Sequence, residues 1–242
     1  MNSKKITKGI ADISQRTAAL VAGIGSLIMF FAAIVAEFLA RQGLVVPGNA
    51  AETAQKIMTH ETLFRAGIFS YLIILILDVV LAWAFYVFLI KVNKSLSLLT
   101  AWFRLVYTAV FGAALLNLVS ILRLISGADF LTVSGTDQLH DQMMLSLTAF
   151  GDGWAIGYMF FSLHVFFLGY LIFRSGYVPR ILGILLIIAS VGYLSDNLAN
   201  LLLPDYLNYK TIFMVIVMVP AIAGEMGLAV WLLLKGGKVP SK

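Results

Sequence analysis

The sequence predicts an all-α membrane protein in which six helices cross the bilayer and pack into one bundle. Of its 242 residues, 61% are hydrophobic and only 12% are charged, and the mean hydropathy is +0.96. Soluble domains are about 45–50% apolar, and their surfaces need more charge than this chain carries. Lipid is therefore the expected solvent around a single transmembrane domain over residues 1–242.

Six apolar runs are long enough for spanning helices, which need ~20 residues to cross the hydrocarbon core. The predicted spans cover residues 17–40, 65–90, 96–125, 143–173, 181–203 and 211–235. Two of these runs are longer than a bilayer requires, which indicates tilt or extension beyond the membrane.

The links between the spans differ in length. Residues 91–95 and 174–180 form short turns, so the second and third spans, and the fourth and fifth, are predicted to be antiparallel neighbours. After the first span, Asn49 and Glu52 have the spacing of a capping box, which predicts an amphipathic helix over residues 50–60 on the outer surface. Another capped helix start is predicted near Thr136.

Basic residues predict the orientation. The side that holds the N-terminus would carry Lys4, Lys5, Lys8, Arg16, Lys91, Lys94, Arg174, Arg180, Lys235, Lys238 and Lys242, and the other side Arg41, Lys56, Arg65, Arg123 and Lys210. Cytoplasmic loops are enriched in Lys and Arg, so both termini are predicted to be cytoplasmic. The bases form no stripe with interleaved aromatic residues, so no nucleic-acid partner is expected despite the net charge of +5.

Six ionisable side chains lie away from the ends of the predicted spans, where facing lipid would cost about 2.5–3.5 kcal/mol or more. They are Asp78, Arg104, Asp152, His164, Asp196 and Glu225. We expect them to face the bundle interior and to line or brace a polar cavity. Glu37 and Arg123 lie near the outer span ends, where long side chains can extend to water.

Asp78 and Arg104 are predicted to form an ion pair. Both belong to the hairpin of spans two and three, and their depths counted from its turn differ by ~6 Å, which a long arginine side chain can reach. A structural clamp is the simpler interpretation, and a gated or ligand-binding role stays open.

Asp152 and Asp196 are predicted to lie at similar depth in the outer halves of spans four and five. Two such carboxylates could share a proton or bind a cation in a common outer-facing pocket. Alternatively, nearby asparagines or water satisfy them. Close to Asp152, Gly153 and Gly157 form a small-xxx-small pattern, which favours helix packing and makes an oligomer contact possible.

His164 and Glu225 have less defined roles. His164 is the histidine within a predicted span, and hydrogen bonding to a neighbouring carbonyl or acid is more typical there than metal ligation, which needs three or four ligands. Glu225 follows Pro220, whose kink frees a backbone carbonyl. Cysteine is absent, and no zinc-protease, serine-elbow or phosphate-loop motif occurs, so no cofactor, metal or catalytic residue is assigned.

Several long stretches resemble the DUF4386 family of six-span bacterial membrane proteins. They include AEFLARQGLVVPGNAAETAQKI, NKSLSLLTAWFRLV, SLHVFFLGYLIFRSGYVPRILGILL and GYLSDNL. The resemblance covers nearly the whole chain. It implies a protein of the bacterial inner membrane, and it supplies no catalytic residues.

The expected function is non-enzymatic. A polar-lined cavity between spans two to six would bind or conduct a small molecule, a lipid or an ion, with membrane lipid as the surrounding partner. One alternative is an intramembrane enzyme that acts on a lipid, with a carboxylate or His164 as the base. Another is a scaffold or sensor subunit whose buried charges only fix helix packing.

Overall fold

The computed structural model of the protein describes residues 13–126 and 136–236, and within these ranges it contains helices and no strands. Six helices are long and apolar enough to cross a membrane: Gln15–Gln42, Glu61–Leu89, Lys94–Ile125, Gln138–Ser175, Arg180–Leu202 and Asn208–Leu234. The all-α, six-span prediction is therefore confirmed. The orientation argument used Lys4, Lys5, Lys8, Lys238 and Lys242, which lie outside the described residues.

Four of the spans are built on continuous α-helices, and two are composite. The continuous helices are α3 (Glu61–Leu89), α4 (Lys94–Ile125), α5 (Thr136–Ser175) and α6 (Arg180–Leu202). The first span consists of α1 (Gln15–Ala33) and the π-helical η2 (Ile34–Gln42). The last consists of α7 (Tyr206–Ala221), the π-helical η4 (Ile222–Met226) and α8 (Gly227–Leu234). A kink was expected at Pro220, and a π-helical turn follows it.

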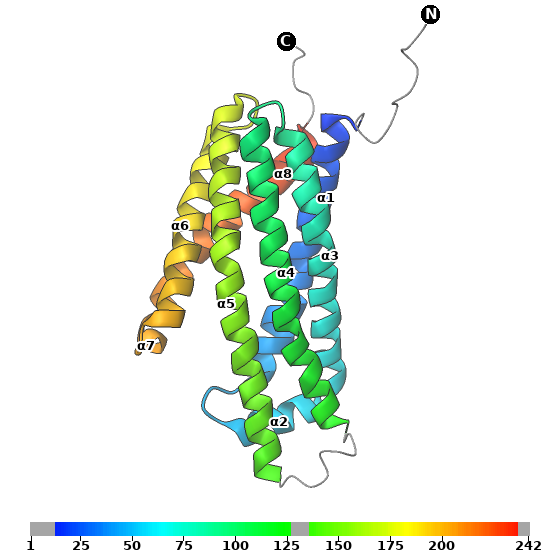
Figure 1. The fold of residues 1–242 in the computed structure, drawn as a ribbon, viewed down its shortest axis with the longest axis vertical. Helices are drawn as coiled ribbons and strands as arrows, with labels where there is room; N and C mark the ends of the chain where they lie inside the picture. The colour runs from blue at the N-terminus through cyan, green and yellow to red at the C-terminus, as the bar shows by residue number, and fades with distance from the viewer. Residues whose placement is uncertain (1–12, 127–135, 237–242) are drawn as a thin grey trace, which may run out of the picture.

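The helices form an elongated bundle (Figure 1), in which α4 lies between α3 and α5, α1 packs against α3, and α6 packs against α5. The two short turns put α3 beside α4, and α5 beside α6, as predicted. The α6–α7 pair leans away from the other helices at the end of the bundle near α2. The predicted link between spans three and four covers residues 126–142, of which 127–135 lie outside the described residues, and α5 begins at Thr136.

The predicted amphipathic helix is α2 (Ala50–Thr59), which lies across the end of the bundle opposite the two short turns. The Asn49 side chain accepts a hydrogen bond from the Glu52 backbone N–H at 3.0 Å and donates one to the Glu52 carboxylate at 3.1 Å. Thr53, Ala54 and Ile57 are buried, while the opposite face is exposed. The capping pattern therefore predicted this helix correctly.

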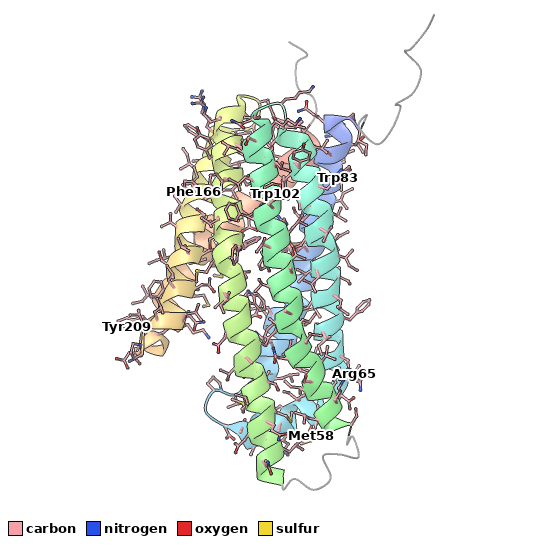
Figure 2. The ribbon with its side chains drawn as sticks, in the orientation of Figure 1. Met58, Arg65, Trp83, Trp102, Phe166 and Tyr209 are labelled. Carbon is pink, nitrogen blue, oxygen red and sulfur yellow. The ribbon has the colours of Figure 1, made fainter. Side chains whose placement is uncertain are left out.

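Large apolar side chains cover the outside of the bundle, as lipid contact requires. Trp83, Trp102, Phe166 and Tyr209 point outward from α3, α4, α5 and α7 (Figure 2), and each is more than a third exposed. A soluble protein would not expose such a surface to water.

Glycines set the closest helix contacts. A Cβ on Gly183 of α6 would lie 2.7 Å from the carbonyl oxygen of Gly169 on α5, and one on Gly153 would lie 2.7 Å from the Cβ of Ala114 on α4. Gly157, which lies on α5 like Gly153, packs against Tyr107 of α4. The small-residue pattern of Gly153 and Gly157 thus brings α5 and α4 of one chain together.

Replacing Gly183 by alanine should lower the free energy of unfolding by about 1–3 kcal/mol, because the new methyl group overpacks two backbones that cannot separate locally. Denaturant titration in mixed micelles measures the change. Gly151→Ala is the matched control, since a Cβ there meets nothing within 4 Å, and it should be neutral or stabilising by up to ~1 kcal/mol. Equal effects of the two substitutions would contradict the close α5–α6 packing.

Candidate functional site

A cavity of about 210 Å³ lies inside the bundle, between α1, α3, α4, α5, α6 and the η4–α8 segment. Its lining side chains include Met29, Tyr71, Asp78, Phe85, Arg104, Tyr107, Trp154, Tyr158, Phe161, His164, Tyr193 and Glu225. Four of the six predicted polar residues therefore meet around one space. Asp152 and Asp196 do not belong to it.

The centre of the site is the ion pair between Asp78 of α3 and Arg104 of α4, which confirms the pair predicted from the hairpin. The Nη2 and Nε atoms of Arg104 lie 2.7 and 2.9 Å from Asp78 Oδ1. The two residues are 1% and 5% exposed. A buried pair of this kind needs further hydrogen bonds to offset the loss of hydration.

His164 of α5 supplies one of those hydrogen bonds. Its Nε2 lies 3.0 Å from Arg104 Nη1, and its Nδ1 lies 2.9 Å from the carbonyl oxygen of Thr100. A guanidinium can only donate, so Nε2 accepts and Nδ1 carries the hydrogen that is donated to Thr100. The histidine is therefore neutral, and it bonds to a carbonyl as expected. Through these two hydrogen bonds it joins α5 to the Asp78–Arg104 pair.

One oxygen of Asp78 is left without a partner. Both guanidinium contacts go to Oδ1, while Oδ2 is buried and has no hydrogen bond within the described residues. Arginine usually engages both oxygens of a carboxylate in a fork. An unpaired buried acceptor is costly, and this one belongs to a side chain that lines the cavity.

Glu225 brings a second carboxylate to the cavity from the π-helical η4. Its Oε1 accepts a hydrogen bond from the Tyr193 hydroxyl of α6 at 2.7 Å. The four ion pairs among the described residues do not include Glu225. Sequence reasoning named this acid, but its phenolic partner could not be chosen among nine tyrosines.

Aromatic rings form most of the remaining wall. Tyr107, Tyr158, Phe161 and Tyr193 lie with ring centroids 4.9 to 5.7 Å apart in successive pairs, in tilted and edge-on contacts. The guanidinium of Arg104 also lies 5.7 Å from the centroid of Phe161. These contacts hold the rings around the polar groups.

A second polar cluster adjoins the cavity through Tyr71. The Tyr71 hydroxyl donates to Glu37 Oε2 at 2.8 Å, Arg41 forms an ion pair with Glu37, and the Arg41 guanidinium lies over the Trp154 ring at 5.6 Å. The side chain of Glu37 is 15% exposed, so it does not extend to water as expected. The position of Glu37 near the end of the span predicted that its side chain would reach water. The π-helical segment instead places Glu37 and Arg41 against α3 and α5.

The predicted acidic pair of Asp152 and Asp196 does not form. Asp196 accepts from the Tyr206 hydroxyl at 2.7 Å, and Asp152 is exposed. Asp152 lies 23 residues before the end of α5 and Asp196 lies 16 residues after the start of α6, so their depths differ by ~10 Å. The prediction counted from the outer span ends, and α5 extends beyond the bilayer length.

No group of three or more metal-ligating side chains occurs in the part of the chain that the structure describes. The cavity instead combines a neutralised ion pair, a neutral histidine, a second carboxylate and aromatic rings. Such a lining can bind a small molecule through a few polar contacts on a largely apolar wall.

The chain belongs to the family described as Domain of unknown function (DUF4386), whose profile matches residues 21–236. An uncharacterized protein from Archaeoglobus fulgidus is 36% identical over 173 residues, which are 72% of this chain and 83% of that protein. No solved structure matches the chain. The family resemblance seen in the sequence is therefore confirmed, and it brings no activity with it.

Replacing Arg104 by methionine should lower the free energy of unfolding by about 3–5 kcal/mol, because it leaves the Asp78 carboxylate buried and unpaired. Thermal or denaturant unfolding in detergent measures the loss. Arg65→Met is the control, since Arg65 pairs with Glu61 at 2.6 Å on an exposed helix surface, and its loss should cost ~0.5 kcal/mol or less. Similar losses for both variants would mean that the buried pair does not hold the bundle together.

Proposed function

We propose that the protein binds or conducts a small molecule, a lipid or an ion through the central cavity and has no enzymatic activity. The observation that carries the proposal is the cavity itself. It is lined by side chains from all six spans, which include the Asp78–Arg104 pair and Glu225. Intramembrane ionisable groups around a cavity are typical of ligand and ion pathways.

The two π-helical segments support the same function. Glu225 lies in η4, and η2 begins directly after Ala33, which lines the cavity. π-Helical turns are frequent at functional sites, and irregular helix segments at membrane depth occur where they face protein or a cavity. A bundle that served only as a scaffold would need neither the cavity nor these turns.

The alternative of a lipid-modifying enzyme with His164 as base has less support. A general base needs a free acceptor nitrogen within reach of the substrate proton. Both ring nitrogens of His164 are engaged, Nε2 by Arg104 and Nδ1 by Thr100.

Filling the cavity tests the proposal. Ser26 of α1 lines the cavity, and Ile24 of the same helix is 52% exposed. Native mass spectrometry of the purified wild-type protein should show a retained small molecule or lipid. Ser26→Phe should remove that molecule by occupying its volume, while the matched variant Ile24→Phe should retain it. Wild-type protein that carries nothing, together with a Ser26→Phe variant that only becomes more stable, would mean that the cavity is a packing void.

The proposed site of action is the cytoplasmic (inner) membrane of the cell, with both termini cytoplasmic. The basic residues of the two short turns support this orientation: they are Lys91, Lys94, Arg174 and Arg180. Loops rich in Lys and Arg remain on the cytoplasmic side of the membrane.

Cysteine labelling tests the orientation, since the chain has no cysteine of its own. Ser95 at the α3–α4 turn and Gln55 on α2 are both exposed. A membrane-impermeant maleimide applied to intact cells should label Gln55→Cys and spare Ser95→Cys, and both should react after lysis. The reverse pattern would place the termini on the outside.

A further inference from the structure

We infer that the ligand of the cavity is a small organic ammonium cation, whose charged end lies beside Glu225 and against the wall formed by the rings of Tyr158, Phe161 and Tyr193. This inference rests on the proposed function and specifies its ligand. It follows from the charge balance of the lining, the arrangement of the rings and the size of the space.

The charge balance leaves one carboxylate without a counter-ion. Arg104 is the cationic side chain of the lining, and Asp78 neutralises it at 2.7 Å. His164 is neutral, because its Nε2 accepts from Arg104. Glu225 has a tyrosine hydroxyl as its hydrogen-bond donor and no ion-pair partner among the described residues. A buried carboxylate is costly unless a positive charge or a proton compensates it, and an organic cation beside Glu225 would supply that charge.

The rings around Glu225 suit an organic cation. Tyr193 donates its hydroxyl to Glu225, and its ring lies 5.5 Å from that of Tyr158 and 5.7 Å from that of Phe161. Aromatic faces attract ammonium groups within ~6 Å, and aromatic cages are the usual recognition site for quaternary ammonium groups. The carboxylate and the rings thus act on the same charge.

The same lining disfavours other ligands. An anion would need donors from Arg104, but Nε, Nη1 and Nη2 of that guanidinium already contact Asp78, His164 and Met29. A zinc-type metal ion would need three or four protein ligands, and no group of three or more acid, histidine or cysteine side chains occurs among the described residues.

The space limits the size of the cation. A cavity of about 210 Å³ is somewhat larger than the ~150 Å³ engineered cavity that takes up benzene. A trimethylammonium group with a short polar arm fits this volume, whereas a phospholipid does not.

Three probes of matched shape and different charge test the inference. Choline is a cation, 3,3-dimethylbutan-1-ol is its neutral carbon analogue, and 3,3-dimethylbutanoate is a related anion. Binding to the purified wild-type protein is measured by calorimetry and by the fluorescence of Trp154, which lines the cavity. Choline should bind at least tenfold more tightly than the neutral alcohol, and the anion should not bind.

Equal binding of choline and the alcohol would overturn the cation inference and leave the proposed function standing. Failure of choline to bind would overturn the cation inference, whereas the proposed function depends on the separate comparison of Ser26→Phe with Ile24→Phe.

Two variants and one matched control test which residues recognise the positive charge. Glu225→Gln removes the charge and keeps an acceptor for Tyr193, so it should weaken choline binding at least tenfold and leave the alcohol unchanged. Asp196→Asn is the matched control, because Asp196 also accepts from a tyrosine hydroxyl at 2.7 Å but lies outside the cavity, and it should bind choline like the wild type. Tyr158→Leu, which changes no charge, should reduce the preference for choline over the alcohol severalfold. Unchanged choline binding in folded Glu225→Gln protein would overturn the inference.

Discussion

The buried guanidinium of Arg104 is the constraint on which the rest of the bundle depends. A charge at this depth is tolerated only when every donor finds an acceptor, and the acceptors come from three neighbours: Asp78 on α3, His164 on α5 and Met29 on α1. Satisfying one side chain therefore fixes the rotation and the height of four helices. Close contacts such as those at Gly153 and Gly183 then bring the backbones together.

The Asp78–Arg104 network contains more polar groups than helix packing requires. Apolar residues of similar volume often replace a buried ion pair without loss of stability, so packing alone does not require one here. Arg104 binds a single oxygen of Asp78, and the other oxygen is buried without a hydrogen-bond partner among the described residues. Glu225 adds a carboxylate that packing does not need either. The structural and ligand-binding interpretations of Asp78 thus apply to different oxygens of the same side chain.

The sequence predicted the fold and part of the site for identifiable reasons. The spans follow from hydropathy, and α2 follows from the Asn49 cap. The Asp78–Arg104 pair was predictable because both residues were counted from one short turn, so errors in the span ends cancelled. For Asp152 and Asp196 the count began at the far ends of the helices, and the 38-residue span that ends at Ser175 made the depths wrong. Arg104 and His164 belong to spans that no short turn connects. Their contact depends on how each helix is rotated about its axis, and hydropathy and residue counting do not determine that rotation.

Glu37 shows a further reason why site residues escape a reading of the sequence. Its depth near a span end was judged correctly, but a regular α-helix was assumed. The nine-residue π-helical segment η2 changes which side chains share a face. It puts Glu37 in contact with Tyr71, a residue of the cavity wall, and places Arg41 over Trp154. The same kind of segment carries Glu225 at the other side of the cavity. In both composite spans a departure from α-helical geometry therefore brings a carboxylate to a tyrosine of the cavity wall, and such departures leave no signature in apolar periodicity.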